Sequence, residues 1–344
     1  MRSRIFALVL ITVVFFTMPL SVCPQTTAQD KRGGAIFVFL TDEFWLNLHH
    51  FLYVLGRAEN KETNATREAV AAAPADQQSG LEKLSGKEQT IWREAVAAYA
   101  AGSSKKDVVF DDPLPAITSA LAQAGDAKSL NGSQVDPAVA TILERAAPIY
   151  QKAWWTKHHD ANQNWQKAIQ ALLDRHGVNV LGFITNAYKL QWPETGFPVH
   201  VSAYANWAGA YSVTGNLLVL SSLAPGNQAA YGLETIFHEG MHQWDDQTLE
   251  VMIELAKKAN KFAPRGLMHA LIFYTAGEAI RRAVRDHVPY AEKFGVWQRG
   301  MGPFKTALEE IWQPYLDGHG TRDEAFTELI KRTAIEPPKK PVSN

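Results

Sequence analysis

Cysteine is nearly absent from this sequence. The only cysteine among the 344 residues is Cys23, close to the N-terminus. A chain with one cysteine cannot form an intrachain disulfide, and removal of an N-terminal segment would leave no cysteine at all. The fold must therefore be stable without covalent crosslinks, for which about 315 residues provide an ample hydrophobic core.

An excess of one charge is also missing. The chain has 34 Lys and Arg against 35 Asp and Glu, a net charge of -1, and the two signs are interspersed. Without a basic stripe, we expect no nucleic-acid partner. Beyond the N-terminal segment no apolar run is long enough to cross a membrane, so no integral membrane span is expected in the mature chain.

Residues 1–28 have the features of a secretory signal peptide. Arg2 and Arg4 precede an apolar run of fourteen residues, 5–18, which is short for a membrane span. Small residues before position 29 predict cleavage after Ala28. The chain is therefore expected to be exported.

Two other fates of this N-terminal segment remain open. The segment can stay attached as an uncleaved anchor, or Cys23 can carry a lipid. Lipid attachment is disfavoured because Val22 stands where a small residue is needed. A short signal and a cysteine-free mature chain favour a periplasmic or secreted bacterial protein.

The sequence His238-Glu239-Gly240-Met241-His242 contains the pattern H-E-x-x-H. On a helix, positions i and i+4 lie one turn apart on the same face, so both imidazoles can bind one tetrahedral Zn²⁺. Glu239 can then accept a proton from a water that the metal activates. The alternative is an ordinary helix with two histidines. Apolar residues at spacings of three and four predict that this helix is half-buried: Leu233, Ile236, Phe237, Met241 and Trp244.

A catalytic zinc usually has three protein ligands. The metzincin pattern is excluded because Asp245 and Thr248 occupy its later positions. Glu278 is the next candidate, since it lies in an apolar stretch of a second predicted helix, where an unpaired carboxylate is costly. The alternative is that Glu278 pairs with Arg281 or Arg282.

With these residues, the chain resembles the gluzincin-type zinc metallopeptidases over roughly residues 200–285. The resemblance implies one zinc per chain, with His238, His242 and Glu278 as ligands and Glu239 as general base. The sequence departs from the better-known members because it has no N-E-x-x-S-D motif around Glu278.

The predicted fold class is α+β, mainly helical and zincin-like. A helical N-terminal region is expected over 29–177, a zincin-like catalytic region over 178–335 and a disordered tail over 336–344. The segments 178–184, 199–204, 209–213 and 217–220 have the patterns of strands, and 214–216 that of a hairpin turn. They predict a small antiparallel sheet before the H-E-x-x-H helix. Residues 206–211 are the candidate edge that binds an extended peptide, unless this hairpin only covers the helix.

The predicted function is that of an exported zinc-dependent metallohydrolase, a peptidase acting on peptides or proteins. Tyr274, one turn before Glu278, is the candidate donor to the oxyanion, with His269 and Tyr211 as rivals. Asp245 or Asp246 can orient a ligand imidazole, although simple surface charge is the favoured explanation for both. Two alternatives remain: a non-catalytic binding or structural protein on the same scaffold, and a zinc hydrolase of non-peptide amides.

Overall fold

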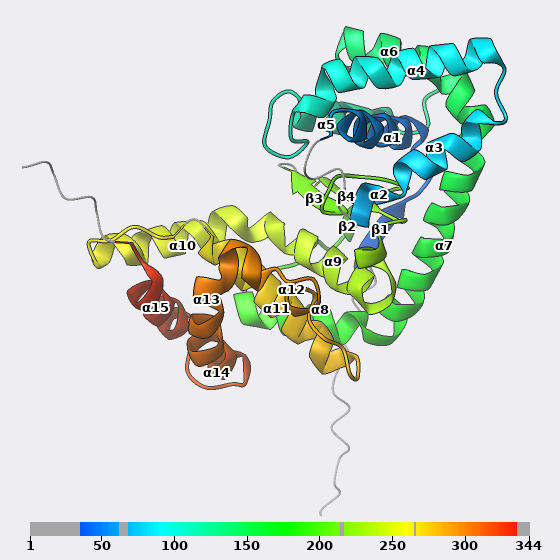
Figure 1. Cartoon of the computed structure of the whole chain (residues 1–344). Coiled ribbons are helices and arrows are strands. Elements are labelled where there is room, and N and C mark those ends of the chain that lie inside the picture. The colour runs from blue at the N-terminus through cyan, green and yellow to red at the C-terminus, as the bar shows by residue number, and fades with distance from the viewer. Residues whose placement is uncertain (1–34, 62–67, 214–216, 265, 336–344) are drawn as a thin grey trace, which may run out of the picture. The chain divides into compact units, whose positions relative to one another are not determined.

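A four-stranded mixed sheet lies between two groups of helices in the computed structural model (Figure 1). The model describes residues 35–335, except 62–67, 214–216 and 265. The strands occur in the order β1-β2-β4-β3; their bounds are Phe37–Leu40 (β1), Phe197–Ser202 (β2), Ala210–Val213 (β3) and Leu217–Ser221 (β4). The predicted signal peptide, Cys23, the predicted hairpin turn and the predicted tail lie outside the described residues.

The predicted helical character is confirmed. The helices between β1 and β2 are α1 (Phe44–Glu59), α2 (Glu68–Ala71), α3 (Ala73–Leu81), α4 (Gly86–Ala101), α5 (Leu114–Ala124), α6 (Pro137–Tyr150), α7 (Thr156–Leu172) and α8 (Val178–Tyr188). Those after β4 are α9 (Ala229–Met241), α10 (Asp245–Lys258), α11 (Leu267–Ala283), α12 (Tyr290–Lys293), α13 (Gly302–Ala307), α14 (Gln313–Leu316) and α15 (Arg322–Thr333).

The prediction of an antiparallel sheet is wrong. Only β3 and β4 pair antiparallel, whereas β1 with β2 and β2 with β4 are parallel. Parallel neighbours need long crossover connections. Here the partners β1 and β2 are separated by all the helices from α1 to α8, so no local pattern in the sequence predicts this pairing.

The expected strand at 178–184 is a helix. Its buried residues are Val180, Leu181, Ile184, Ala187 and Tyr188, which follow the 3.6-residue period of a helix rather than the alternation of a strand. The helix continues through Gly177, where a boundary between regions was expected. A side chain there would meet Ile36 Cδ1 at 3.0 Å; the glycine therefore permits close packing and does not end the helix.

The two faces of the sheet pack against different hydrophobic cores. In β4, Leu218 and Leu220 belong to the core that contains α8, α9 and α11. Leu217 and Val219 point into the core formed by α1 and α4 to α6. Figure 1 shows these two helix groups on opposite sides of the sheet. The H-E-x-x-H segment thus lies on one face, with α9 next to β3 and β4.

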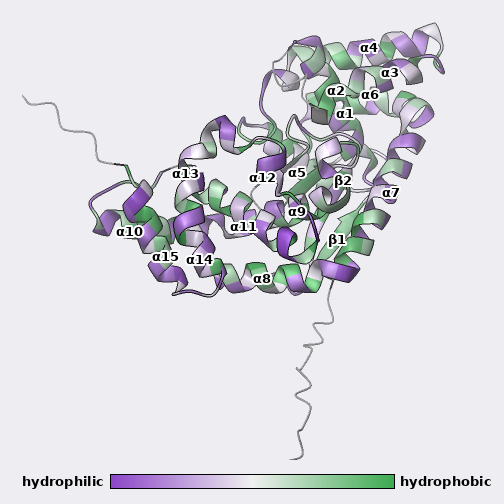
Figure 2. Cartoon of the chain, turned by 60° about the horizontal axis from the view of Figure 1, so that its bottom comes forward, coloured by the Kyte–Doolittle hydropathy of each residue, from purple (hydrophilic) through white to green (hydrophobic). Residues whose placement is uncertain are grey.

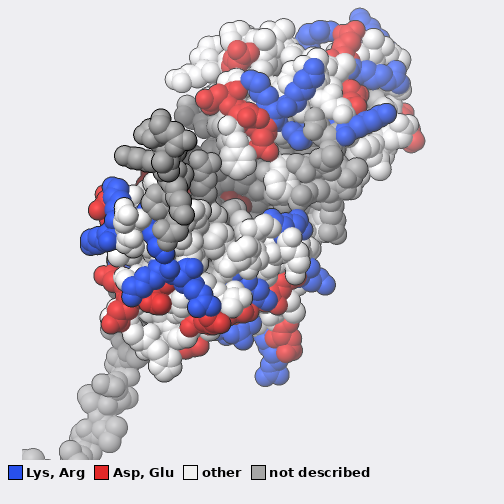
Figure 3. Space-filling model, turned by 60° about the vertical axis from the view of Figure 1, so that its left-hand side comes forward, with Lys and Arg blue, Asp and Glu red and all other residues white. Residues whose placement is uncertain are grey.

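Apolar and charged residues are distributed differently over the strands and the outer helices. Figure 2 shows β1 largely in the hydrophobic colour, whereas α10 and α13 alternate between apolar and polar residues. On the face seen in Figure 3, acidic and basic side chains are interspersed. In the described part of the chain, no helix is both long enough and apolar enough to cross a membrane.

Candidate metal centre

The H-E-x-x-H segment lies at the end of α9, next to a change of helix type. His238 and Glu239 are in the last turn of α9, and His242 opens the 3-10 turn His242–Trp244 that leads into α10. Four of the predicted apolar residues are completely buried: Leu233, Ile236, Phe237 and Met241. They hold the helix against the core, and this fixes where the two histidines point.

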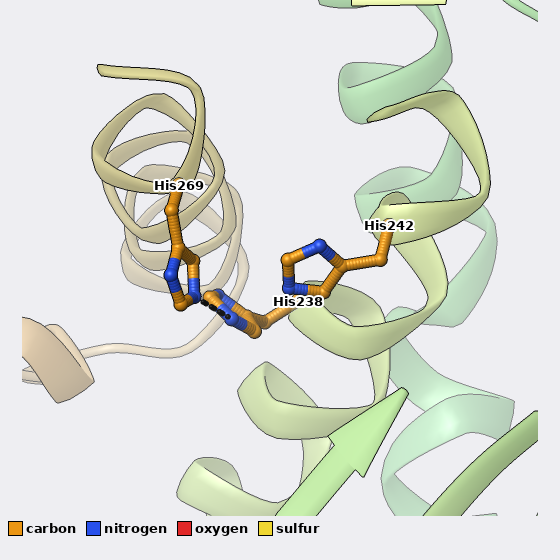
Figure 4. A group of neighbouring side chains, drawn as sticks. All are labelled: His238, His242 and His269. Atoms are coloured by element: carbon orange, nitrogen blue, oxygen red, sulfur yellow. Dashed lines mark hydrogen bonds between the residues drawn. The ribbon is translucent and has the colours of Figure 1, made fainter. Parts of the chain in front are cut away.

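Three histidines converge at this place (Figure 4). His238 and His242 come from α9 and the turn after it, and His269 comes from the first turns of α11. Each ring contributes one nitrogen to a group whose atoms all lie within 4.8 Å of one another. The Nε2 atoms of His238 and His269 are 3.2 Å apart.

These residues fit a transition-metal ion. Two nitrogens bound to a tetrahedral Zn²⁺ at about 2.0–2.1 Å lie about 3.3 Å from each other, close to the observed separation of His238 and His269. Three neutral imidazoles with one further open position form a typical catalytic donor set. The three histidines could therefore hold a metal ion.

Asp245 fixes the orientation of His242. Its Oδ2 lies 2.8 Å from Nδ1 of His242, so the ring donates its Nδ1 hydrogen and keeps Nε2 for a metal. A carboxylate behind a ligand histidine sets the tautomer and raises the basicity of the ring. The sequence left this role open for Asp245 or Asp246 and favoured simple surface charge, whereas Asp245 forms the hydrogen bond.

Phe273 holds the other two rings. Its centroid lies 4.1 Å from that of His238 and 4.8 Å from that of His269. Phe273 follows His269 by one helical turn on α11, so both point to the same side. The aromatic ring limits the rotation of both imidazoles.

Glu239 follows His238 in the sequence, interacts electrostatically with His242 and is held by the sheet. The hydroxyl of Ser212, on β3, lies 2.8 Å from Oε2 of Glu239 and 3.0 Å from its backbone oxygen. Glu239 is 8% exposed. A buried carboxylate with a fixed hydrogen bond next to the metal ligands is suited to accept a proton.

The protonation of the site follows from burial and neighbouring charges. Burial and the nearby His269 and His242 lower the pKa of His238 well below that of an ordinary histidine. Burial, with His242, lowers the pKa of His269 to about 3. Both rings are therefore neutral near pH 7, as metal ligands must be.

The pKa values of Glu239 and His242 are raised instead. Burial raises the pKa of Glu239, although His242 and the hydrogen bond from Ser212 act against it. Burial also acts to lower the pKa of His242, but the hydrogen bond to Asp245 and the charge of Glu239 outweigh it, so this pKa is raised. Because a metal binds the neutral ring, protonation of His242 competes with metal binding.

Glu278 is not part of the histidine group. It lies nine residues after His269, two and a half helical turns, so the two side chains point to opposite faces of α11. Its carboxylate accepts two hydrogen bonds of 2.7 Å from Arg281 and lies 3.7 Å from Arg282. The ion pair with these arginines, which the sequence left open as an alternative, is present.

Tyr274 also points elsewhere. Its hydroxyl donates to Oε1 of Gln313 at 2.9 Å. Its rival Tyr211 lies on the other face of the sheet, where its hydroxyl is 2.7 Å from Nε2 of His50. Neither hydroxyl contacts Glu239 or the three histidines through a hydrogen bond among the described residues.

Sequence reasoning missed His269 as a ligand and Ser212 as a partner of Glu239. The signal for His269 was available, because it stands at the start of the same predicted helix as Glu278. The signal for Ser212 was absent, since a serine in a strand is common. Compared with protein-family models, curated proteins and solved structures, the chain shows no match.

Proposed function

We propose that this protein is an exported zinc-dependent metallohydrolase that cleaves peptide bonds. The observation that carries the proposal is the convergence of His238, His242 and His269, together with the buried carboxylate of Glu239, which Ser212 holds and which interacts electrostatically with His242. A metal kept only for folding needs the three histidines but has no use for this carboxylate.

Zinc would be held by the three histidines, with Asp245 and Phe273 supporting their rings. When bound, the ion supplies Lewis acidity to a carbonyl group and to a water molecule. Glu239 then takes the proton of the attacking water and gives it to the leaving amine, a task that suits a carboxyl group whose pKa is raised by burial.

The sheet edge supports a peptide as substrate. β3 has one described neighbour, β4, and lies at the end of the strand order. An extended peptide can pair with such an edge through main-chain hydrogen bonds. Ser212 connects this strand directly to Glu239, so a peptide bound there would lie close to the proton acceptor. Of the edge expected over 206–211, Ala210 and Tyr211 lie in β3.

The proposed ligand set differs from the gluzincin pattern in its third member. Gluzincins use a glutamate from the following helix, and Glu278 was expected to fill that place. In this structure the following helix presents His269, and Glu278 is paired with Arg281. We therefore propose the resemblance for His238, Glu239 and His242, and assign the third position to His269.

The proposal is tested with Glu239→Gln. We expect this variant to bind as much zinc as the wild type and to lose hydrolysis of a peptide library by at least about 100-fold, because the amide cannot accept the proton. Zinc content is measured by elemental analysis and cleavage by mass spectrometry. If the variant cleaves as well as the wild type, the mechanism is wrong; if the zinc-loaded wild type cleaves nothing, a binding or structural role replaces it.

A further inference from the structure

Ser212 forms a hydrogen bond that ties the carboxylate of Glu239 to the sheet. Along β3, Tyr211 faces the core of α1, whereas Ala210 belongs to the core that contains α9. Ser212 is on the α9 side by the alternation of a strand. Its Oγ is 2.8 Å from Oε2 of Glu239 and 3.0 Å from the carbonyl oxygen of the same residue.

The direction of this hydrogen bond is fixed by chemistry. A carbonyl oxygen and an ionised carboxylate only accept, so the serine hydroxyl is the donor, shared between two acceptors on one residue. Oε2 thus already accepts one hydrogen bond. Among the described residues, Oε1 of Glu239 accepts none, so it is the oxygen at which no other donor competes with an incoming proton.

We infer that Ser212 is a positioning residue that holds Oε2 of Glu239 and thereby reserves Oε1 for the proton transfer. The inference rests on the proposed hydrolase function. A glutamate side chain has several rotatable bonds, so ordering it costs conformational entropy. Ser212 has a single side-chain torsion and sits on a strand paired with Leu218 of β4, so it keeps the carboxylate in one place before a substrate arrives.

If Ser212 positions Glu239, its loss should slow the chemical step. Among the described residues, Ser212 forms hydrogen bonds with Glu239 and none with the three histidines, so metal binding should not depend on it. A misplaced proton acceptor lowers kcat, whereas substrate binding, and with it KM, is left nearly unchanged. A purely structural role would instead lower the melting temperature or the zinc content.

The test compares four variants of the zinc-loaded protein on one peptide that the wild type cleaves. For Ser212→Ala we expect kcat to fall about 10- to 100-fold with KM changed less than about twofold. Ser212→Thr keeps the hydroxyl and should recover most of the activity, whereas Ser212→Val, which has the shape of threonine without the hydroxyl, should not. Glu239→Gln serves as the inactive reference, and zinc content and melting temperature are measured for all.

The outcomes separate this inference from the proposed function. Full activity in Ser212→Ala, or equal activity in the Thr and Val variants, overturns the role of Ser212 while Glu239→Gln still shows the hydrolase mechanism. Loss of zinc or of thermal stability to the same degree in the Thr and Val variants also overturns it, because the role is then structural. An active Glu239→Gln contradicts the proposed function itself.

Discussion

Each side chain of the candidate metal centre is held by a neighbouring side chain. Asp245 binds the ring of His242, Phe273 packs against the rings of His238 and His269, and Ser212 binds Glu239. Such supporting contacts keep functional groups within a fraction of an ångström of their working positions. The site is therefore organised by the protein before a metal binds.

Asp245→Ala tests whether the hydrogen bond to His242 supports metal binding. The loss of the hydrogen bond to Nδ1 of His242 frees the ring and its tautomer, so we expect zinc affinity to fall about 10- to 100-fold. Zinc affinity is measured by competition with a chromophoric chelator. Asp246→Ala is the control, since both aspartates lie in the first turn of α10 and Asp246 is exposed. Equal losses in the two variants would mean that only negative charge matters.

Among the elements, α9 owes its position to a close approach at Gly240. A side-chain carbon at this position would lie 2.5 Å from Cη2 of Trp192. The indole is itself fixed, because its Nε1 donates to the backbone oxygen of Ile36 at 2.9 Å and its ring packs on Phe37. Gly240, between the two site histidines, thus lets α9 lie directly on the tryptophan next to β1.

We expect Gly240→Ala to lower the free energy of unfolding by about 1–3 kcal/mol, since the overlap with Trp192 outweighs the better helix propensity of alanine. Gly182→Ala is the matched control: Gly182 lies in α8 with no atom within 4 Å of an added side chain, so it should stabilise by about 0.5–1 kcal/mol. Denaturant unfolding measures both. If Gly240→Ala raised the free energy of unfolding, Trp192 would have room for the added methyl group, and the prediction would be wrong.

The elements that could be predicted from the sequence are those with a local pattern. The α9 helix and the strand β2 have a clear periodicity, and β3 and β4 flank the turn residues of a hairpin; the prediction of these elements is confirmed. The helix at 178–188 was missed because its short apolar run suits a strand as well as a helix. β1 was missed because four residues before a helix carry little signal, and its partner β2 is distant in the sequence.

For the candidate metal centre, too, only the residues that are close in the sequence could be predicted to lie together. His238, Glu239 and His242 are neighbours in the sequence, so their proximity follows from one helical turn. The third histidine depends on how α11 packs against α9, which sets the face of α11 that meets the pair. Periodicity within α11 defines two opposite faces, one with His269 and Phe273 and the other with Tyr274 and Glu278, but it does not say which face points to α9.

At the scale of the whole molecule, a buried polar network joins helices distant in the sequence. The carboxylate of Asp76, on α3, lies 2.8 Å from His158 and 2.6 Å from Lys157 on α7, and accepts a hydrogen bond of 3.0 Å from Tyr204. Asp76 is 6% exposed. Removing such a buried charge partner is costly, so the network contributes to the cohesion of the N-terminal helices with α7.

This network predicts the acid sensitivity of the fold. Burial acts to raise the pKa of Asp76, but the hydrogen bonds from His158 and Lys157 outweigh it and lower the pKa from 3.8 to about 2. A carboxyl group with a lowered folded-state pKa stabilises the fold above its unfolded pKa, and this stabilisation is lost as the pH falls through the folded value.

Between pH 4 and pH 2 the wild type should therefore lose about 2 kcal/mol more of its unfolding free energy than Asp76→Asn, whose side chain does not titrate. Urea unfolding at a series of pH values measures the difference. If the unfolding free energies of the two proteins changed equally between pH 4 and pH 2, Asp76 would not be the group that makes the fold sensitive to acid.

The central claim is that His238, His242 and His269 bind one zinc ion. Elemental analysis of the purified protein beside His269→Ala and Glu278→Ala tests it most directly. We predict about one zinc per chain in the wild type and in Glu278→Ala, and loss of zinc in His269→Ala. Zinc retained in His269→Ala but lost in Glu278→Ala, or a wild type that binds no zinc after reconstitution, would contradict the claim.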